Sequence, residues 1–573
     1  MLDEGLFRAP RFGAAWAPVA LLTVPLAEAV GAGLAGDGAD AAARGAARAV
    51  MAQLRAARVG GAPGLADPGP AGLGLPARGA VLLLDPGDPA RAAAARGLLA
   101  ALAGRPVLVA LDPDAPPGAA PVLAAAGAAV LPGRLAPWTL LDLAAELHTL
   151  SPGMALLAGA AGVPVRLDGA APWGGAAPEA AFAALLAATR WADPFRDRPW
   201  TAAEGIAQLE AWRRVEAANR RIVACTGIEW FKHRAMLAAL ASQSGPPRIV
   251  MRGSTALRLA RQAGGDAAVW AAVMPRDLPA RAAAAGVGLV RIEDGFLRSA
   301  GLGVQGARAA ALVLDGSGIH YDPSTPSDLE RLLAETDFDA ALLGRAARLR
   351  AAIVAAGVTK YNLTGTAELP PLPPGKRVIL VPGQVEDDAA VRQGGSRLRT
   401  NLGLLRAVRA TNPDAVILFK PHPDVQAGMR RGAVPEAGML ADHVLRDLPI
   451  GPLYALAQEV HCLSSLAGFE ALLRGLRVVT WGRPFYAGWG LTEDCDPPPR
   501  RGRALSLDAL VAGALILHQR CIDPRSGLPC PPELLVERLA APRSAAPAPR
   551  VPAPLRALVA RWSRAMAGWW AAR

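Results

Sequence analysis

The sequence predicts an α/β protein that is built from parallel sheets and divided into several domains. Its 573 residues allow three to four domains at about 150 residues each. Short apolar runs alternate with Ala-rich helical patterns along most of the chain, and this alternation is typical of βα units with parallel strands. We expect strands at residues 80–84, 106–110, 221–224, 287–292, 311–314, 378–381, 415–419 and 477–480.

The composition excludes a disordered chain, because hydrophobic residues make up 52% and charged residues 19% of it. No stretch of 18 or more residues lacks both charge and proline, so no transmembrane helix is predicted. Near the N-terminus, Asp3 and Glu4 precede an apolar run that contains Pro18 and Pro25, which makes a poor signal peptide. The sequence therefore favours a cytoplasmic protein.

The net charge of +12 is mostly compositional background. Only four of the 61 basic residues are lysines, and the excess of Ala, Gly, Pro and Arg is typical of a GC-rich coding sequence. We therefore predict no nucleic-acid partner, and we treat the rare residues as more informative than the common ones. The five cysteines are odd in number and form no C-x-x-C pair, so we expect free thiols, with neither a zinc site nor a disulfide framework. We predict no bound metal and no cofactor.

An internal repeat divides the chain. Residues 148–151 (HTLS), the helical pattern after them and Gly162 match residues 461–464 (HCLS), a second helical pattern and Gly475 without a gap. Polar residues of the second copy are missing from the first: Gln384, Lys420, His422 and Glu470 fall opposite Gly87, Ala110, Asp112 and Leu157. We infer that the first copy is a degenerate lobe and that the active site belongs to residues 221–540.

These observations predict six segments along the chain. They are an N-terminal segment (1–39), a degenerate Rossmann-like lobe (40–215), a first lobe on the acceptor side (221–344), a second lobe on the donor side (345–540), a Pro/Ala linker (541–554) and an amphipathic tail helix (555–573). The tail places Leu and Trp side chains on one arc and arginines on the others, which suits an interfacial helix or packing onto the preceding domain.

An acidic motif follows the strand predicted at 287–292. Glu293 and Asp294 come directly before Gly295. Ligands bind at the carboxyl ends of the strands of an open parallel sheet, so the two carboxylates suit acid or base chemistry there. A helix N-cap with a turn is the alternative interpretation.

A basic motif and an acidic run follow two later strands. Lys420 and His422 stand in the sequence FKPHPDV and could hold a phosphate, although a His at a strand end is commonly structural. The sequence GQVEDD contains Gln384 and ends at Asp388, and its acids could form a solvated loop or face a bound sugar.

A fourth motif begins a helix. Ser464 and Ser465 offer hydroxyls at a helix N-terminus, where an anion is favoured, and Glu470 on the same helix could hydrogen-bond a ribose. A capped helix with one exposed Glu is the alternative. Residues 301–306 fit G-x-G-x-x-G, but a strand pattern follows them, so no dinucleotide site is predicted, and the chain has no P-loop.

Together these motifs resemble those of a known family. The acidic E-D-G and basic H-P motifs look like the pair in GT-B glycosyltransferases that use CMP-activated acidic sugars. The ordered sequences EDGFLRS, GSGIHYDP, TKYN, GQVEDD, KPHPDV, GFEALLRG and PFYAGWGLTED more closely resemble the capsule polysaccharide biosynthesis proteins of the KpsC/LipB type, which are β-Kdo transferases. The resemblance covers about residues 221–540 and implies a GT-B fold with two Rossmann-like lobes.

The resemblance also implies roles for individual residues. Asp388 would be the nucleophile that attacks the anomeric carbon of CMP-Kdo, with Asp387 as an open alternative, and Glu293 and Asp294 would do acid and base work for the acceptor. Lys420 and His422 would hold the CMP phosphate, assisted by Ser464 and Ser465. Glu470 would contact the ribose, and Arg298 or Arg252 would offset the carboxylate of the sugar.

The partners implied are CMP-Kdo, a lipid acceptor such as lysophosphatidylglycerol or its Kdo-extended form, the cytoplasmic face of the inner membrane and other capsule assembly proteins. Because only one module keeps its motifs, we expect one type of linkage. Two alternatives stay open: a non-enzymatic scaffold for capsule assembly or export, and a GT-B enzyme that uses another CMP-sugar such as CMP-sialic acid.

Overall fold

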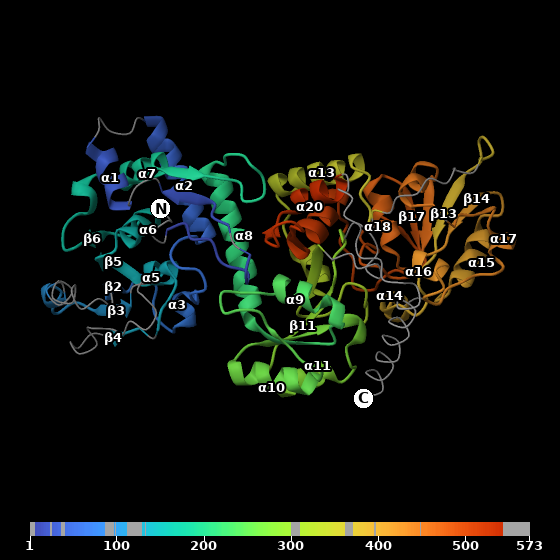
Figure 1. Cartoon of the computed structure of the whole chain (residues 1–573), viewed down its shortest axis with the longest axis horizontal. Helices are drawn as coiled ribbons and strands as arrows, with labels where there is room; N and C mark the ends of the chain where they lie inside the picture. The colour runs from blue at the N-terminus through green and yellow to red at the C-terminus, as the bar shows by residue number, and fades with distance from the viewer. Residues whose placement is uncertain are drawn as a thin grey trace. The chain divides into compact units, whose positions relative to one another are not determined.

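A computed structural model shows two compact units, which are described separately (Figure 1). It describes residues 6–15, 17–22, 26–35, 41–85, 97, 99–111, 129–131, 133–298, 310–360, 362, 371–394, 397–446 and 448–541. Unit 1 contains Met1–Arg220 and Ala241–Pro246, and unit 2 contains Arg221–Leu240 and the chain from Pro247 onward. The predicted tail helix at 555–573 and the motif at 301–306 lie outside the described residues.

Unit 1 has a five-stranded parallel sheet in the order β4-β3-β2-β5-β6. Its strands are β2 (Ala80–Asp85), β3 (Val107–Leu111), β4 (Ala129–Val130), β5 (Ala144–Thr149) and β6 (Val165–Leu167). An antiparallel pair consists of β1 (Ala20–Leu22) and β7 (Thr189–Trp191). The helices are α1 (Leu26–Ala35), α2 (Ala41–Ala57), α3 (Gly69–Gly72), α5 (Pro137–Leu143), α6 (Pro152–Ala161), α7 (Pro178–Ala187) and α8 (Ala202–Arg221).

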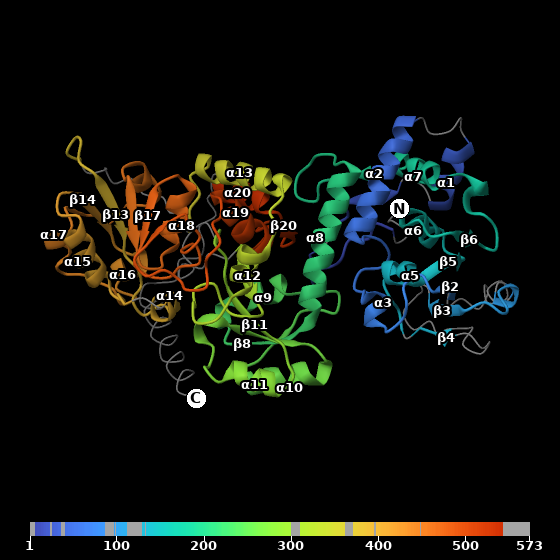
Figure 2. The same cartoon turned by 180° about the vertical axis from the view of Figure 1, so that it is seen from behind.

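The first lobe of unit 2 has a seven-stranded sheet in the order β20-β19-β12-β11-β10-β8-β9. Its strands are β8 (Ile222–Thr226), β9 (Arg248–Ile249), β10 (Asp266–Trp270), β11 (Leu289–Asp294), β12 (Ala311–Asp315), β19 (Arg520–Ile522) and β20 (Pro529–Cys530). Its helices are α9 (His233–Ala239), α10 (Gly253–Ala263), α11 (Leu278–Ala284), α12 (Asp328–Glu335), α13 (Ala340–Ala355) and α20 (Pro532–Ala540). Residues 520–540 thus return to the first lobe, whereas the sequence placed them with the second; α20 lies beside α13 (Figure 2).

The second lobe has a six-stranded parallel sheet in the order β15-β14-β13-β16-β17-β18. Its strands are β13 (Val378–Pro382), β14 (Val416–Lys420), β15 (His443–Val444), β16 (Glu459–Cys462), β17 (Arg477–Thr480) and β18 (Glu493–Asp494). Its helices are α14 (Ala389–Gln393), α15 (Asn401–Thr411), α16 (Pro423–Gln426), α17 (Ala437–Leu440), α18 (Leu466–Leu473) and α19 (Leu507–Val511), and a π-helical stretch (Ala512–His518) follows. Unit 2 therefore has the two Rossmann-like lobes of a GT-B fold, as predicted.

Each strand predicted from the sequence coincides with an observed strand, but one pairing differs. β12 runs antiparallel to β11, and β19 and β20 continue the antiparallel part. The prediction of purely parallel strands is wrong for this side of the sheet. Apolar clusters pack on both faces of the first sheet and on both faces of the second.

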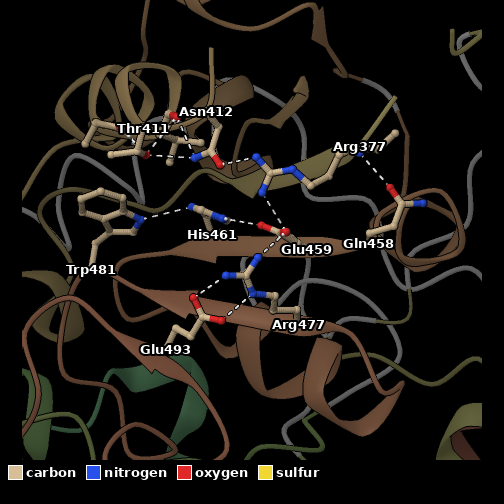
Figure 3. A network of polar contacts seen from close by, with 12 residues as sticks. Arg377, Thr411, Asn412, Gln458, Glu459, His461, Arg477, Trp481 and Glu493 are labelled. Atoms are coloured by element: carbon tan, nitrogen blue, oxygen red, sulfur yellow. Dashed lines mark hydrogen bonds and ion pairs between the residues drawn. The ribbon is translucent and has the colours of Figure 1, made fainter. Parts of the chain in front are cut away.

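The sheet of unit 1 repeats the strand order of the second lobe, as the duplication of a lobe requires. A buried polar contact also recurs: His148 contacts Glu146 on β5 at 3.0 Å, and His461 contacts Glu459 on β16 at 3.2 Å. In the second lobe, Arg377 and Arg477 bind Glu459, and the chain of contacts extends to Trp481 and Glu493 (Figure 3). The contacts of Glu459 with Arg377 and Arg477 lie at the starts of the strands, and the network reaches the carboxyl end of β17 at Trp481.

Among the described residues, no helix is long and apolar enough to cross a membrane.

Candidate active site

The acidic pair lies at the carboxyl end of β11, where the sequence placed it. The Glu293 carboxylate accepts a hydrogen bond from the Asp294 amide at 3.0 Å and one from the Tyr321 hydroxyl at 3.4 Å. Desolvation by the surrounding protein, followed by the neighbouring charge of Asp294, raises the pKa of Glu293 to about 7. A carboxyl group that titrates near neutral pH suits general acid or base catalysis.

Asp294 has a different partner. Its carboxylate forms an ion pair with Arg298 at 2.8 Å, and the two side chains are only 15% and 13% exposed. Arg298 therefore already neutralises the carboxylate of Asp294. Its predicted interaction with the carboxylate of the sugar stays a prediction. Arg252, the other predicted partner of the sugar carboxylate, is exposed at the residue before α10 and makes no side-chain contact with the acidic pair in the described structure.

The acidic run after β13 contains one carboxylate without a partner. The Glu386 carboxylate accepts a hydrogen bond from the Asn401 amide at 2.7 Å, and Asp387 pairs with Arg430 at 3.2 Å. Asp388 is exposed at the N-cap of α14, and its side chain makes no hydrogen bond or ion pair with any described residue. Because Asp387 is already paired and Asp388 has no partner among the described residues, Asp388 is favoured over Asp387 as the carboxylate that contacts a ligand.

The negative charge of Asp388, in the second lobe, affects the pKa of Glu293 and Tyr321 in the first lobe. After desolvation and Asp294, its negative charge also raises the pKa of Glu293. Burial and the charges of Glu293 and Asp388 raise the pKa of Tyr321, which stays a neutral hydroxyl donor. The charge of the predicted nucleophile is therefore felt by Glu293 of the predicted acid/base pair.

The basic motif at the end of β14 combines a neutral His with positive charges. The His422 Nδ1 accepts a hydrogen bond from the Asp424 amide at 3.2 Å, which leaves the proton on Nε2. Burial, and then the positive charges of Lys360, Lys420 and Arg430, lowers the pKa of His422 to about 3. In this tautomer the Nε2 of His422 is a hydrogen-bond donor close to the positive charges of Lys360, Lys420 and Arg430.

Lys420 is buried and tied to its own loop. Its Nζ donates to the Pro421 carbonyl and to the Gln426 Oε1, each at 2.9 Å. A lysine ammonium has three donors. Lys420 therefore stabilises the turn that carries His422. Its positive charge also lies near the His422 ring.

Hydrogen bonds of Gln384 and Ser464 connect the loop after β13 with the loop after β16, and Ser465 caps α18. The Gln384 Oε1 accepts from the Ser464 amide at 2.9 Å, and the Ser464 hydroxyl donates to the Ala390 carbonyl at 3.0 Å. The Ser465 hydroxyl caps α18 by accepting from the Ala467 amide at 3.2 Å. The first two contacts fix the start of α14, and with it Asp388, against the end of β16.

Glu470 is buried on α18 and holds a loop. Its carboxylate accepts from the Tyr454 hydroxyl at 2.7 Å and from the Lys360 amide at 2.6 Å. Burial raises the pKa of Glu470 despite both hydrogen bonds. The structure thus assigns Glu470 a contact that positions Lys360, and the predicted ribose contact stays a prediction.

Four residues with no predicted role lie near the predicted site residues: Tyr321, Lys360, Asp424 and Arg430. Tyr321 and Lys360 are among the four tyrosines and four lysines of the chain, so their rarity was a usable signal. Asp424 is raised in pKa by burial, and its Oδ1 has no hydrogen-bond partner among the described residues. Arg430 carried no signal in a chain with 57 arginines.

Gln519 positions the loop that follows the acidic pair. Its buried Oε1 accepts from the Phe296 amide at 2.6 Å and from the Leu297 amide at 3.0 Å. Phe296 also packs against Phe485 of the PFYAGWG motif, with ring centroids 4.5 Å apart. The chain that returns from the second lobe therefore holds the loop that follows the acidic pair of the first.

The substitution Gln519→Leu should leave the two amides unsatisfied and loosen this loop. We expect a fall in turnover of about 10- to 100-fold, with the KM for the donor changed less than about threefold, because imprecise placement reduces catalysis more than binding. Steady-state kinetics measures both quantities. Gln458→Leu is the matched control, since Gln458 accepts from the Val378 amide away from the site, and it should leave turnover near the wild-type value. Equal losses in the two variants would contradict the positioning role.

Among the described residues, no group of three or more His, Cys, Asp or Glu side chains could hold a metal ion.

Comparisons with known proteins agree with the motifs. Residues 266–368 and 347–519 match a family model described as capsule polysaccharide biosynthesis protein. Over 240 residues, 42% of this chain and 34% of the relative, the chain is 45% identical to the capsule polysaccharide modification protein LipA of Neisseria meningitidis serogroup A. Over 237 residues, 40% of this chain and 54% of the relative, it is 43% identical to the lipopolysaccharide-processing protein LpsZ of Rhizobium meliloti.

The chain thus spans about a third to a half of the length of these relatives. A solved structure is also similar, the chain described as Thermosulfurimonas dismutans KpsC, beta Kdo 2,7 transferase. It is 33% identical, covers 56% of this chain and 98% of its own, and has a TM-score of 0.46. Residues 266–519 of the chain are thus similar to capsule polysaccharide biosynthesis proteins.

Proposed function

We propose that residues 221–540 form a retaining β-Kdo transferase that moves Kdo from CMP-Kdo to a lipid-linked acceptor. The observation that carries this proposal is the Asp388 carboxylate, which has no partner in the described part of the chain and whose charge contributes to a Glu293 pKa of about 7. A nucleophile and a group that titrates near neutral pH are the two parts that a double displacement requires. The choice of Kdo rests on the ordered motifs that resemble the KpsC/LipB-type transferases.

In the first step, an Asp388 oxygen attacks the anomeric carbon of Kdo as the bond from that carbon to the phosphate oxygen breaks. CMP leaves with the bonding electrons, and a sugar ester of Asp388 remains. His422 would donate a hydrogen bond to the departing phosphate, and Lys420 and Lys360 would offset its charge. No proton is needed on the phosphate, because it leaves as an anion.

In the second step, an acceptor hydroxyl attacks the same carbon from the opposite side. Ionised Glu293 accepts the hydroxyl proton, and the Asp388 carboxylate departs unchanged. Two inversions give net retention. The balance is one CMP-Kdo and one acceptor alcohol converted to one glycoside and one CMP.

Unit 1 is proposed to take no part in this chemistry, because Ala110 and Leu157 stand where the second lobe has Lys420 and Glu470. We therefore expect a single linkage type. The test is to incubate the full chain with CMP-Kdo and a Kdo-bearing lysophosphatidylglycerol and to analyse the product by NMR. One linkage supports the proposal, and two different linkages would contradict it.

The same assay separates the alternatives. Release of CMP from CMP-Kdo but not from CMP-sialic acid supports the proposed donor. Release of CMP from CMP-sialic acid alone would show that the donor is CMP-sialic acid and not CMP-Kdo. Release from neither sugar would favour a non-enzymatic role in capsule assembly.

A further inference from the structure

Two large apolar side chains are exposed on the first lobe. Trp230 is 70% exposed and Met251 is 60% exposed. Single exposed apolar residues are common on protein surfaces, but a Trp exposed to this extent loses most of the stabilisation that its burial would give. A second feature of the same region is therefore needed to explain them.

The fold brings these residues to one edge of the sheet. β8 and β9 are parallel neighbours, with Cys225 opposite Ile249, and the Thr226 hydroxyl contacts the Met251 carbonyl at 3.4 Å. Trp230 follows the carboxyl end of β8, and Met251 follows that of β9. Glu293 ends β11 of the same sheet, so the exposed residues lie at the edge that carries the acidic pair.

The turn that carries Trp230 is held in place. The Lys232 ammonium lies 3.8 Å from the centre of the Trp270 ring and pairs with Glu229 at 3.3 Å. A ring nitrogen of His233 contacts the Ile228 carbonyl at 2.9 Å. Exposure of Trp230 is thus a fixed property of an anchored turn, and docking through it would lose little conformational entropy.

The region is also far more basic than the chain as a whole. Residues 226–240 and 248–263 contain six Lys and Arg side chains and one acid, whereas the whole chain has 61 basic and 49 acidic residues. The acid, Glu229, already pairs with Lys232. Arg234 and Arg252 are exposed, and their side chains make no hydrogen bond or ion pair with the described residues. We name Trp230, Arg234, Met251 and Arg252 the acceptor-side rim.

We propose that the acceptor-side rim docks the enzyme on an anionic phospholipid bilayer. A Trp side chain is stable at the boundary between headgroups and acyl chains, Met251 can enter the apolar layer, and the two arginines can bind lipid phosphates. The inference builds on the proposed function only in that a lipid-linked acceptor resides in such a bilayer. Docking here would present the acidic pair to that acceptor.

The test is sedimentation of the full chain with vesicles of phosphatidylcholine, with and without phosphatidylglycerol, and without any sugar donor. The double substitution Trp230→Ser with Met251→Ser should lower the partition coefficient on phosphatidylglycerol vesicles about tenfold, or about 1.4 kcal/mol. Arg234→Ser with Arg252→Ser should lower binding to these vesicles and leave the weaker binding to pure phosphatidylcholine unchanged. All variants keep residues 555–573, so differences between them arise from the rim.

Met439→Ser is the matched control, because Met439 is 78% exposed on α17 of the second lobe. It should bind vesicles as the wild type does. Unchanged binding in the Trp230/Met251 variant, an equal loss in the Met439 variant, or binding of the rim to the acceptor glycan alone would overturn the proposal. Because the assay needs no CMP-Kdo, loss of the proposed activity and loss of docking are observed separately.

Discussion

Replacing Asp388 by Asn should reduce sugar transfer by about 10³-fold or more, because the amide cannot form the covalent intermediate. The rate of CMP release from CMP-Kdo with a lipid acceptor measures this effect. The substitution keeps the size of the side chain and removes no hydrogen bond to a described residue, so the free energy of unfolding should change little.

Asp387→Asn is the sharpest comparison, since Asp387 is the adjacent carboxylate and already pairs with Arg430 at 3.2 Å. It should lose at least about 100-fold less activity than Asp388→Asn, because it removes an ion pair and not the nucleophile. The reverse order of the two losses would move the nucleophile to Asp387.

The second large effect concerns Glu293. With a pKa of about 7, this group is mostly protonated at pH 6 and mostly ionised at pH 8. If ionised Glu293 accepts the proton of the acceptor, the transfer rate should rise with pH through about 7 and then level. Glu293→Gln should lower the rate by about 10²- to 10⁴-fold and abolish this rise.

A pH–rate profile of the wild type and of the Glu293→Gln variant measures the effect, with acceptor at saturating concentration. Glu386→Gln is the control, because Glu386 belongs to the second lobe and its carboxylate accepts from the Asn401 amide. It should keep the rise near pH 7. An unchanged profile in the Glu293→Gln variant would show that another group carries the proton.

The strand ends that carry the site could be predicted from the sequence, since apolar runs directly precede Glu293 and Lys420 in the chain. Parallel strands bring such ends to one edge within each sheet, but Glu293 and Lys420 end strands of two different sheets, so topology alone did not predict that the two motifs approach each other. Strand β10 was not predicted. Its sequence DAAVW is short and Ala-rich, and such a run cannot be distinguished from the helical pattern around it by periodicity. The antiparallel direction of β12 was also missed, because periodicity does not define strand direction.

The partners of the site residues could not be predicted. Glu470 binds the Lys360 amide 110 residues away, and Gln519 binds the loop at Phe296 across 223 residues. Contacts of this kind depend on the tertiary fold, and no local pattern encodes them. The choice of Asp388 over Asp387 likewise needed the position of Arg430.

The most direct test of the proposed mechanism is intact-mass and peptide mass spectrometry of the Glu293→Gln variant after incubation with CMP-Kdo and acceptor. Because this variant should complete the first step and stall in the second, we expect a Kdo adduct on the peptide that contains Asp388, and none when Asp388→Asn is added. CMP release without any adduct, or an adduct on Asp387, would contradict the proposed double displacement through Asp388.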